Sequence, residues 1–121
     1  DFEGEPAKSL EARRRPDSVW RDVAGMLRSF EYAAAVASSR ASAPSTPATP
    51  VSAATTPAAA ARPLAEAFLA GYLGRLPTDE EQTLLAAYSA DKAVYETVYE
   101  THNRPEWVSL PLGALAQIGA P

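Results

Sequence analysis

The residues best suited to chemistry lie in a short internal repeat, "VYETVYET", at residues 94–101. On a helix, the four-residue step puts Tyr95 and Tyr99 on one side, with Glu96 and Glu100 beside them as a second pair. Tyrosine rings can pack on the flat C–H faces of a sugar, and carboxylates accept hydrogen bonds from its hydroxyls. The repeat therefore fits a carbohydrate-facing helix. Periodicity alone favours an amphipathic helix whose tyrosines pack and whose glutamates face water.

Other chemistry-bearing patterns are scarce. His102 is the only histidine, and its place near the end of the expected helix indicates a surface group rather than a catalytic base. The sequence has no cysteine, no glycine-rich phosphate loop, no metal-ligand histidine cluster and no nucleophile motif. An enzymatic function cannot rest on these residues alone.

The first helix that must position these residues is expected over 17–38, capped by Asp17 or Ser18. Apolar side chains recur there at spacings of three and four, which predicts one buried face. The stripe comprises Val19, Trp20, Val23, Met26, Leu27, Phe30 and Ala34.

Three more helices are expected further along the chain. One starts with Pro63 in its first turn and ends at Gly74. The next has a capping box of Thr78 with Glu81 and ends near Asn103, ahead of a proline. The last covers roughly 112–118. The sequence therefore predicts a mainly α fold.

Residues 38–62 are built almost wholly from Ala, Ser, Thr and Pro. Four prolines interrupt any helix there, and a single valine offers little apolar surface to offset the entropy of ordering. We expect a disordered linker or insertion over 38–62, between a first segment at 1–37 and a helical subdomain at 63–121.

The charge and hydropathy of the sequence indicate which kinds of partner to expect. The formal net charge is −4, so the basic run Arg13–Arg15 belongs to an acidic chain, and we expect no nucleic-acid partner. The sequence contains no membrane-spanning apolar run, and it has no signal peptide pattern. A cytoplasmic protein is the expectation.

The opening "DFEGEP" is unlike an ordinary N-terminus and suggests a chain cut from a larger protein. In protein-kinase-like folds, an Asp-Phe pair follows the catalytic loop, and its Asp holds the Mg²⁺ that bridges the nucleotide phosphates. Magnesium uses one or two carboxylates, which suits Asp1 followed by Glu3.

Three blocks together resemble the C-terminal part of bacterial maltokinases, which belong to the aminoglycoside-phosphotransferase-like enzymes. They are "DFEGEP", then "RDVAGMLRSFEYAA", then "DKAVYETVYETHNRPEW" followed by "LPLGAL", covering residues 1–6, 21–34 and 91–115. The resemblance implies the helical C-terminal lobe of a bilobal kinase-like fold. It also implies Mg²⁺- and ATP-dependent phosphorylation of maltose to maltose 1-phosphate, for α-glucan synthesis.

The same resemblance assigns roles to residues. Asp1 is the implied Mg²⁺ ligand, with Glu3 as the neighbouring acid. The residues implied to contact the sugar or shape its pocket are Tyr95, Glu96, Tyr99, Glu100, Asn103, Arg104 and Trp107.

The nucleotide-binding lobe and the catalytic loop of the family are expected upstream of Asp1, in some relatives together with a fused trehalose synthase. Without them we expect an inactive fragment. We also expect it to be only marginally stable, with Trp20, Phe30 and Trp107 lacking partners. The alternative is a non-enzymatic helical module that binds sugar or another protein; only the kinase interpretation requires an upstream HxDxxxxN-type loop.

Overall fold

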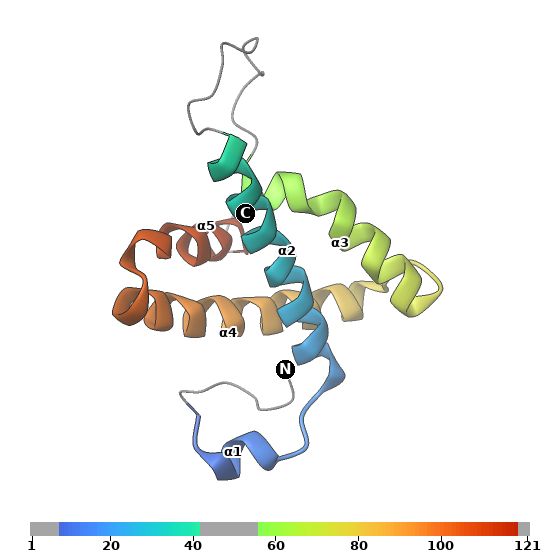
Figure 1. Ribbon diagram of the computed structural model, residues 1–121. Coiled ribbons are helices and arrows are strands. Elements are labelled where there is room, and N and C mark those ends of the chain that lie inside the picture. Colours follow the sequence, from blue (N-terminus) through green and yellow to red (C-terminus); the bar gives the residue numbers. More distant parts are fainter. Residues whose placement is uncertain (1–7, 42–55, 119–121) are drawn as a thin grey trace.

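The computed structural model describes residues 8–41 and 56–118, and within these ranges the protein is all-α, without strands (Figure 1). The elements are α1 Leu10–Arg14, α2 Val19–Ala41, α3 Pro57–Leu73, α4 Asp79–Asn103, a short 3₁₀ helix η1 Pro105–Trp107, and α5 Ser109–Ile118. The mainly α prediction is confirmed. None of these described helices combines the length and apolar character needed to cross a membrane.

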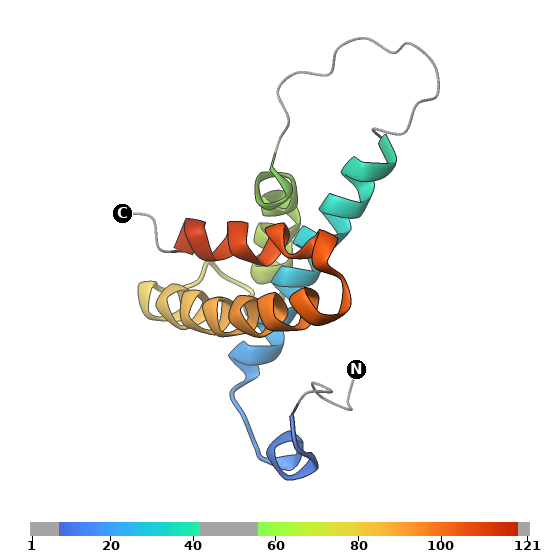
Figure 2. The same ribbon diagram turned by 90° about the vertical axis from the view of Figure 1, so that its left-hand side faces the viewer.

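Helix α2 is the centre of the arrangement. It packs against α3 and against α4, while α5 packs on α4 after the tight connection through η1. Both views show α5 folding back over α4, and α1 standing away from the other helices (Figures 1 and 2). The crossing of α2 over α4 therefore decides which side chains of the repeat are covered.

The expected capping box at the start of α4 is confirmed. Thr78 Oγ1 accepts a hydrogen bond from the backbone N–H of Glu81, and the Glu81 carboxylate accepts one from the N–H of Thr78. Arg75 adds two hydrogen bonds to the same carboxylate, each 2.8 Å long. Unpaired backbone donors of the first turn are thus satisfied, and α4 begins where the sequence predicts.

These bonds predict a pH dependence of stability. Arg75, followed by the backbone N–H of Thr78, lowers the pKa of Glu81 from 4.5 to about 2. A carboxylate with a depressed folded-state pKa contributes stability that is complete above its unfolded pKa and lost as the pH falls. We expect the free energy of unfolding to fall less between pH 4.5 and 2 in Glu81→Gln than in the wild-type protein.

Denaturant unfolding across this pH range measures that difference. Glu80→Gln is the matched control, because Glu80 lies exposed in the same turn but outside the capping box. Identical pH profiles for Glu81→Gln and the wild-type chain would contradict the prediction.

The expected linker boundaries were wrong at both ends. Helix α2 continues to Ala41, and α3 begins at Pro57 rather than Pro63. Thr56 caps α3 through its side chain, Pro57 occupies the first turn where no donor is needed, and an alanine run with high helix propensity follows. Pro63 therefore lies inside the helix. Residues 42–55 of the expected linker lie outside the described residues.

The end of α3 matches its prediction. Gly74 has a left-handed backbone conformation, with φ of 66°, and its N–H donates to the carbonyl of Ala70. Glycine adopts this conformation without the steric cost that a Cβ brings.

The buried interior is small and partly built from alanine. Its apolar members are Val23, Ala24, Ala61, Leu85, Ala93, Pro111 and Ala114. Of the apolar stripe predicted for the first helix, Val19 and Met26 are exposed instead.

The prediction that Trp20, Phe30 and Trp107 lack partners was wrong. Trp20 meets Tyr72 edge-on with ring centroids 6.5 Å apart. In the same way, Phe30 meets Phe68 at 5.8 Å. Trp107 is stacked on Tyr32 of α2. Aromatic pairs of this kind contribute to stability beyond the apolar area that they bury. All three rings therefore have stabilising partners within the described helices.

Candidate functional site

An open groove of about 310 Å³ lies between α2 and α4, and most of the predicted sugar-contact residues line it. Helix α4 contributes Lys92, Tyr95, Glu96, Tyr99, Glu100 and Arg104, and α2 contributes Gly25, Ser29 and Tyr32. Five of the seven residues implied by the family block are therefore brought together. We call this feature the α2–α4 groove.

The two tyrosines of the repeat form one aromatic wall. Their ring centroids are 6.4 Å apart and their planes differ by 17°, so Tyr95 and Tyr99 are stacked along α4. Lys92 Nζ lies 5.3 Å from the centre of the Tyr95 ring, and the Arg104 guanidinium lies 5.9 Å from that of Tyr99. Each ring of the wall thus has the other tyrosine on one side and a cation over it.

An amphipathic helix with solvated glutamates would expose Glu96 to water, but the structure largely buries this side chain. Its side chain is only 12% exposed, and its Oε2 accepts hydrogen bonds from Arg28 Nε at 3.0 Å and Arg28 Nη2 at 2.7 Å. Arg28 itself is 2% exposed and also pairs with Glu31. One buried guanidinium therefore serves two carboxylates, because α2 covers this side of α4.

The burial of Arg28 and Glu96 and the ion pairs of Arg28 explain the directions in which their pKa values shift. Burial disfavours the guanidinium, but the hydrogen bond and charge of Glu96, with the charge of Glu31, outweigh it and raise the pKa of Arg28. Burial also raises the pKa of Glu96, and Arg28 offsets this only in part. Arg28 therefore stays charged, while Glu96 is a carboxylate that burial disfavours.

Glu100 is more deeply buried, at 2% exposure. Its Oε1 accepts hydrogen bonds from Tyr32 Oη at 3.1 Å and Arg104 Nη2 at 2.6 Å, and its Oε2 accepts one from Arg104 Nε at 2.9 Å. Burial, followed by the charges of Glu96 and Glu100, raises the pKa of Tyr32, so its hydroxyl stays a donor. Glu100 therefore positions Tyr32 and Arg104, and its oxygens are already engaged.

The two remaining residues implied to contact sugar lie elsewhere. The exposed Asn103 donates from Nδ2 to the carbonyl of Tyr99 at 2.8 Å, and it does not line the groove. Trp107 stacks on Tyr32 with ring centroids 6.0 Å apart and planes 13° apart, but it borders a different cleft. Asp1 and Glu3, the implied Mg²⁺ ligands, lie outside the described residues.

Sequence reasoning missed the contribution of α2 to the groove. Arg28 and Tyr32 each bond a glutamate 68 positions further along the chain, and no local pattern specifies such a pairing. The available signal was the charge itself: Arg28 lies between Leu27 and Phe30 of the apolar stripe, with Glu31 as its local partner. A cation at such a position indicates a buried acidic partner without naming it.

His102 lies at the surface, as expected. Its ring is exposed, with Nδ1 2.7 Å from the carbonyl oxygen of Val98. Across residues 8–41 and 56–118, no group of three or more His, Cys, Asp or Glu side chains could hold a metal ion.

The groove combines engaged carboxylates with aromatic rings beside an open space. Its carboxylates are held by Arg28, Arg104 and Tyr32, and Tyr95 and Tyr99 line the open space beside them. Beside them, a Cβ built on Gly25 would meet nothing within 4 Å, so this part of α2 is open to a ligand. A flat, hydroxyl-rich molecule matches such a surface.

In a comparison with known protein families, none matches this chain, and the resemblance to maltokinases therefore stays a prediction.

Proposed function

We propose that this chain is the helical C-terminal-lobe part of a maltokinase-type carbohydrate phosphotransferase, and that the α2–α4 groove contacts its sugar acceptor. The observation that carries the proposal is the convergence of five family-block residues on one groove. The stacked rings of Tyr95 and Tyr99 border this groove, and Tyr99 is 38% exposed.

Within this proposal the groove residues divide into two roles. Tyr95 and Tyr99 provide the faces on which a glucose ring stacks, and their hydroxyls and the cations beside them reach its oxygens. Glu96 and Glu100 are positioning residues, since each is held by an arginine. This replaces direct acceptance of sugar hydroxyls by the glutamates.

The phosphoryl-transfer part of the proposal rests on the resemblance. Asp1 is the proposed Mg²⁺ ligand, with Glu3 beside it, and ATP is the proposed phosphate donor. The nucleotide lobe, the catalytic base and a second metal-holding residue are proposed to precede Asp1. Alone, these 121 residues are expected to bind sugar and not to transfer phosphate.

A second candidate is a helical binding module without enzymatic activity. The aromatic pairs Trp20–Tyr72, Phe30–Phe68 and Tyr32–Trp107 favour it, because they join α2 to its neighbours within the described chain. Such a module binds sugar through the groove or binds another protein. The two candidates differ in whether the protein transfers phosphate.

A maltose titration of this chain, followed by NMR, tests the groove. We expect amide shifts to change around Ser29, Tyr95 and Tyr99, with weak binding. Tyr99→Ala should weaken the affinity about three- to tenfold, since stacking of this kind contributes roughly 1 kcal/mol.

Tyr72→Ala is the matched control, because Tyr72 is 51% exposed and stacks on Phe68 four residues earlier, as Tyr99 does on Tyr95. Gly25→Leu provides a second variant, whose side chain occupies the open part of the groove. Unchanged spectra at high maltose, or equal losses in the Tyr99 and Tyr72 variants, would contradict the sugar-contact role.

A further inference from the structure

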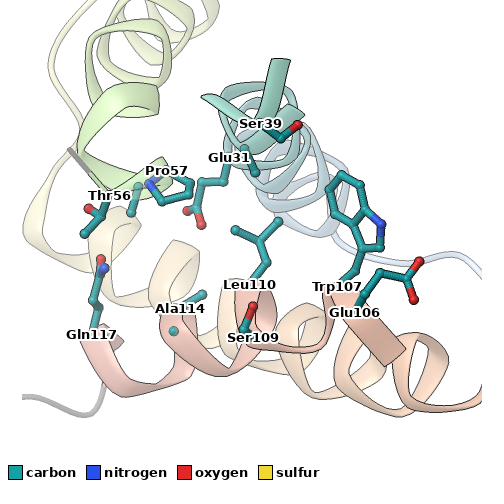
Figure 3. Close-up of a pocket in the computed structure, with 13 residues that line it drawn as sticks. Glu31, Ser39, Thr56, Pro57, Glu106, Trp107, Ser109, Leu110, Ala114 and Gln117 are labelled. Carbon is teal, nitrogen blue, oxygen red and sulfur yellow. The ribbon is translucent and has the colours of Figure 1, made fainter. Parts of the chain in front are cut away.

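A second concavity lies on the other side of Trp107 from the groove residues and is larger, at about 500 Å³. We call it the α2–α5 cleft. It is bounded by the second half of α2, the first turn of α3, η1 and α5 (Figure 3). A cavity of this size is in the range that holds a small organic molecule.

The walls of the cleft are mainly apolar. Ala35 of α2, Pro57 and Ala58 of α3, and Leu110 and Ala114 of α5 line it, with Leu110 projecting between α2 and α5 (Figure 3). A ligand that fills this space must therefore offer an apolar body, because hydrophobic burial supplies most of its binding.

Two carboxylates, and no Lys, Arg or His, are among the described residues that line the cleft. Glu31 reaches from α2 into the space on one side of Leu110, and Glu106 stands beside Trp107 on the other (Figure 3). The ligand charge that complements this lining is positive, at two separated points.

The ion pairs of the protein leave Glu31 able to take a second cationic partner. Arg28 is the partner of Glu31, but the same guanidinium also serves Glu96, so two carboxylates share one cation. The side chain of Glu31 is 22% exposed, which leaves it accessible from the cleft yet partly removed from water. Attraction between charges is stronger there than at a fully solvated surface.

The aromatic residue of the cleft acts as a wall and not as a cage for the cation. One face of Trp107 is stacked on Tyr32, and the Arg104 guanidinium already lies 5.6 Å from the centre of its ring. Recognition of a quaternary ammonium needs free aromatic faces, so the carboxylates are the groups that select the ligand here.

We propose that the α2–α5 cleft binds an aliphatic diamine, with one ammonium group at Glu31, the other at Glu106, and the methylene chain along Leu110 and Trp107. This site is separate from the α2–α4 groove and does not depend on the proposed kinase function. Its ligand is defined by two primary ammonium groups joined by an apolar chain.

The test compares 1,5-diaminopentane, 1-aminopentane and 1,5-pentanediol as probes of the 121-residue chain by NMR titration. The diamine should shift the signals of Leu110, Ala114 and the Trp107 indole. It should bind about two- to fivefold more tightly than the monoamine, as expected for one added contact with an exposed carboxylate, and the diol should not bind. The affinity should also fall with added salt.

Variants then assign the two ends. Glu106→Gln changes an exposed side chain and should reduce diamine affinity about two- to fivefold, to that of the monoamine. Glu31→Gln should have a similar effect, and Arg28 keeps Glu96 as its partner in that variant. Glu66→Gln is the control, because Glu66 is exposed on α3 and does not line the cleft.

Gly113→Leu provides an independent variant. Gly113 lines the cleft, and a Cβ placed there meets nothing within 4 Å, so leucine should block the ligand while the helix is retained. Absence of diamine binding, equal affinity for diamine and monoamine, or shifts confined to residues outside the cleft would each overturn the proposal.

Discussion

Arg28→Ala is expected to destabilise the protein by about 3–5 kcal/mol, the cost of leaving a buried charge without its partner. Arg28 is 2% exposed and is the cation that Glu96 and Glu31 share. Its removal leaves Glu96 buried with its pKa already raised by burial, so the carboxylate must take up a proton or pull water into the α2–α4 contact. Denaturant unfolding monitored by circular dichroism measures the effect.

Arg21→Ala is the matched control. Arg21 lies on the same helix and also pairs with two carboxylates, Asp17 and Asp91, the second of them on α4. Its side chain is 28% exposed and its partners are 48% and 61% exposed, so we expect a loss of only about 0–1 kcal/mol.

A double variant separates charge from packing. In Arg28→Met with Glu96→Met, both charges of the pair are replaced by apolar side chains, and most of the lost stability should return. Equal small losses in Arg28→Ala and Arg21→Ala would contradict a buried, shared cation at the centre of the protein.

Elements with strong local signals could be predicted from the sequence. The start of α4 follows from a capping box, whose two hydrogen bonds join residues three positions apart. The end of α3 follows from Gly74, because a left-handed residue that stops a helix is most often glycine. In both places the information and the interaction lie within one turn.

The start of α3 was mispredicted because two local tendencies conflict there. Prolines at 57 and 63 argue against a continuous helix, while the intervening alanines favour one. The structure combines both, with Pro57 in the first turn and Pro63 inside the helix.

The candidate site could be located only in part. The spacing of Tyr95 and Tyr99 was enough to place them on one face, and the structure stacks them. The same spacing could not predict that α2 crosses the side of α4 that bears Glu96 and Glu100. This crossing buries both glutamates, which were expected to be solvated if the helix were only amphipathic. Tertiary packing decided their roles, and it joins residues far apart in the chain.

The second large effect concerns phosphoryl transfer. A chain extended upstream of Asp1 through its reading frame should transfer phosphate from Mg-ATP to maltose, and the 121-residue chain should not. In the extended chain, Asp1→Ala should lower kcat by roughly a hundredfold or more, because a group that positions charge in the transition state is lost. Asp22→Ala, which changes an exposed acid on α2, should leave the rate unchanged.

The most direct test of the account is therefore the formation of maltose 1-phosphate by the extended chain, compared with its Asp1→Ala variant. We expect activity that requires Mg-ATP and maltose and that is lost in the variant. An inert extended chain, or one whose activity survives Asp1→Ala, would contradict the kinase function. The helical binding module would then be the better description.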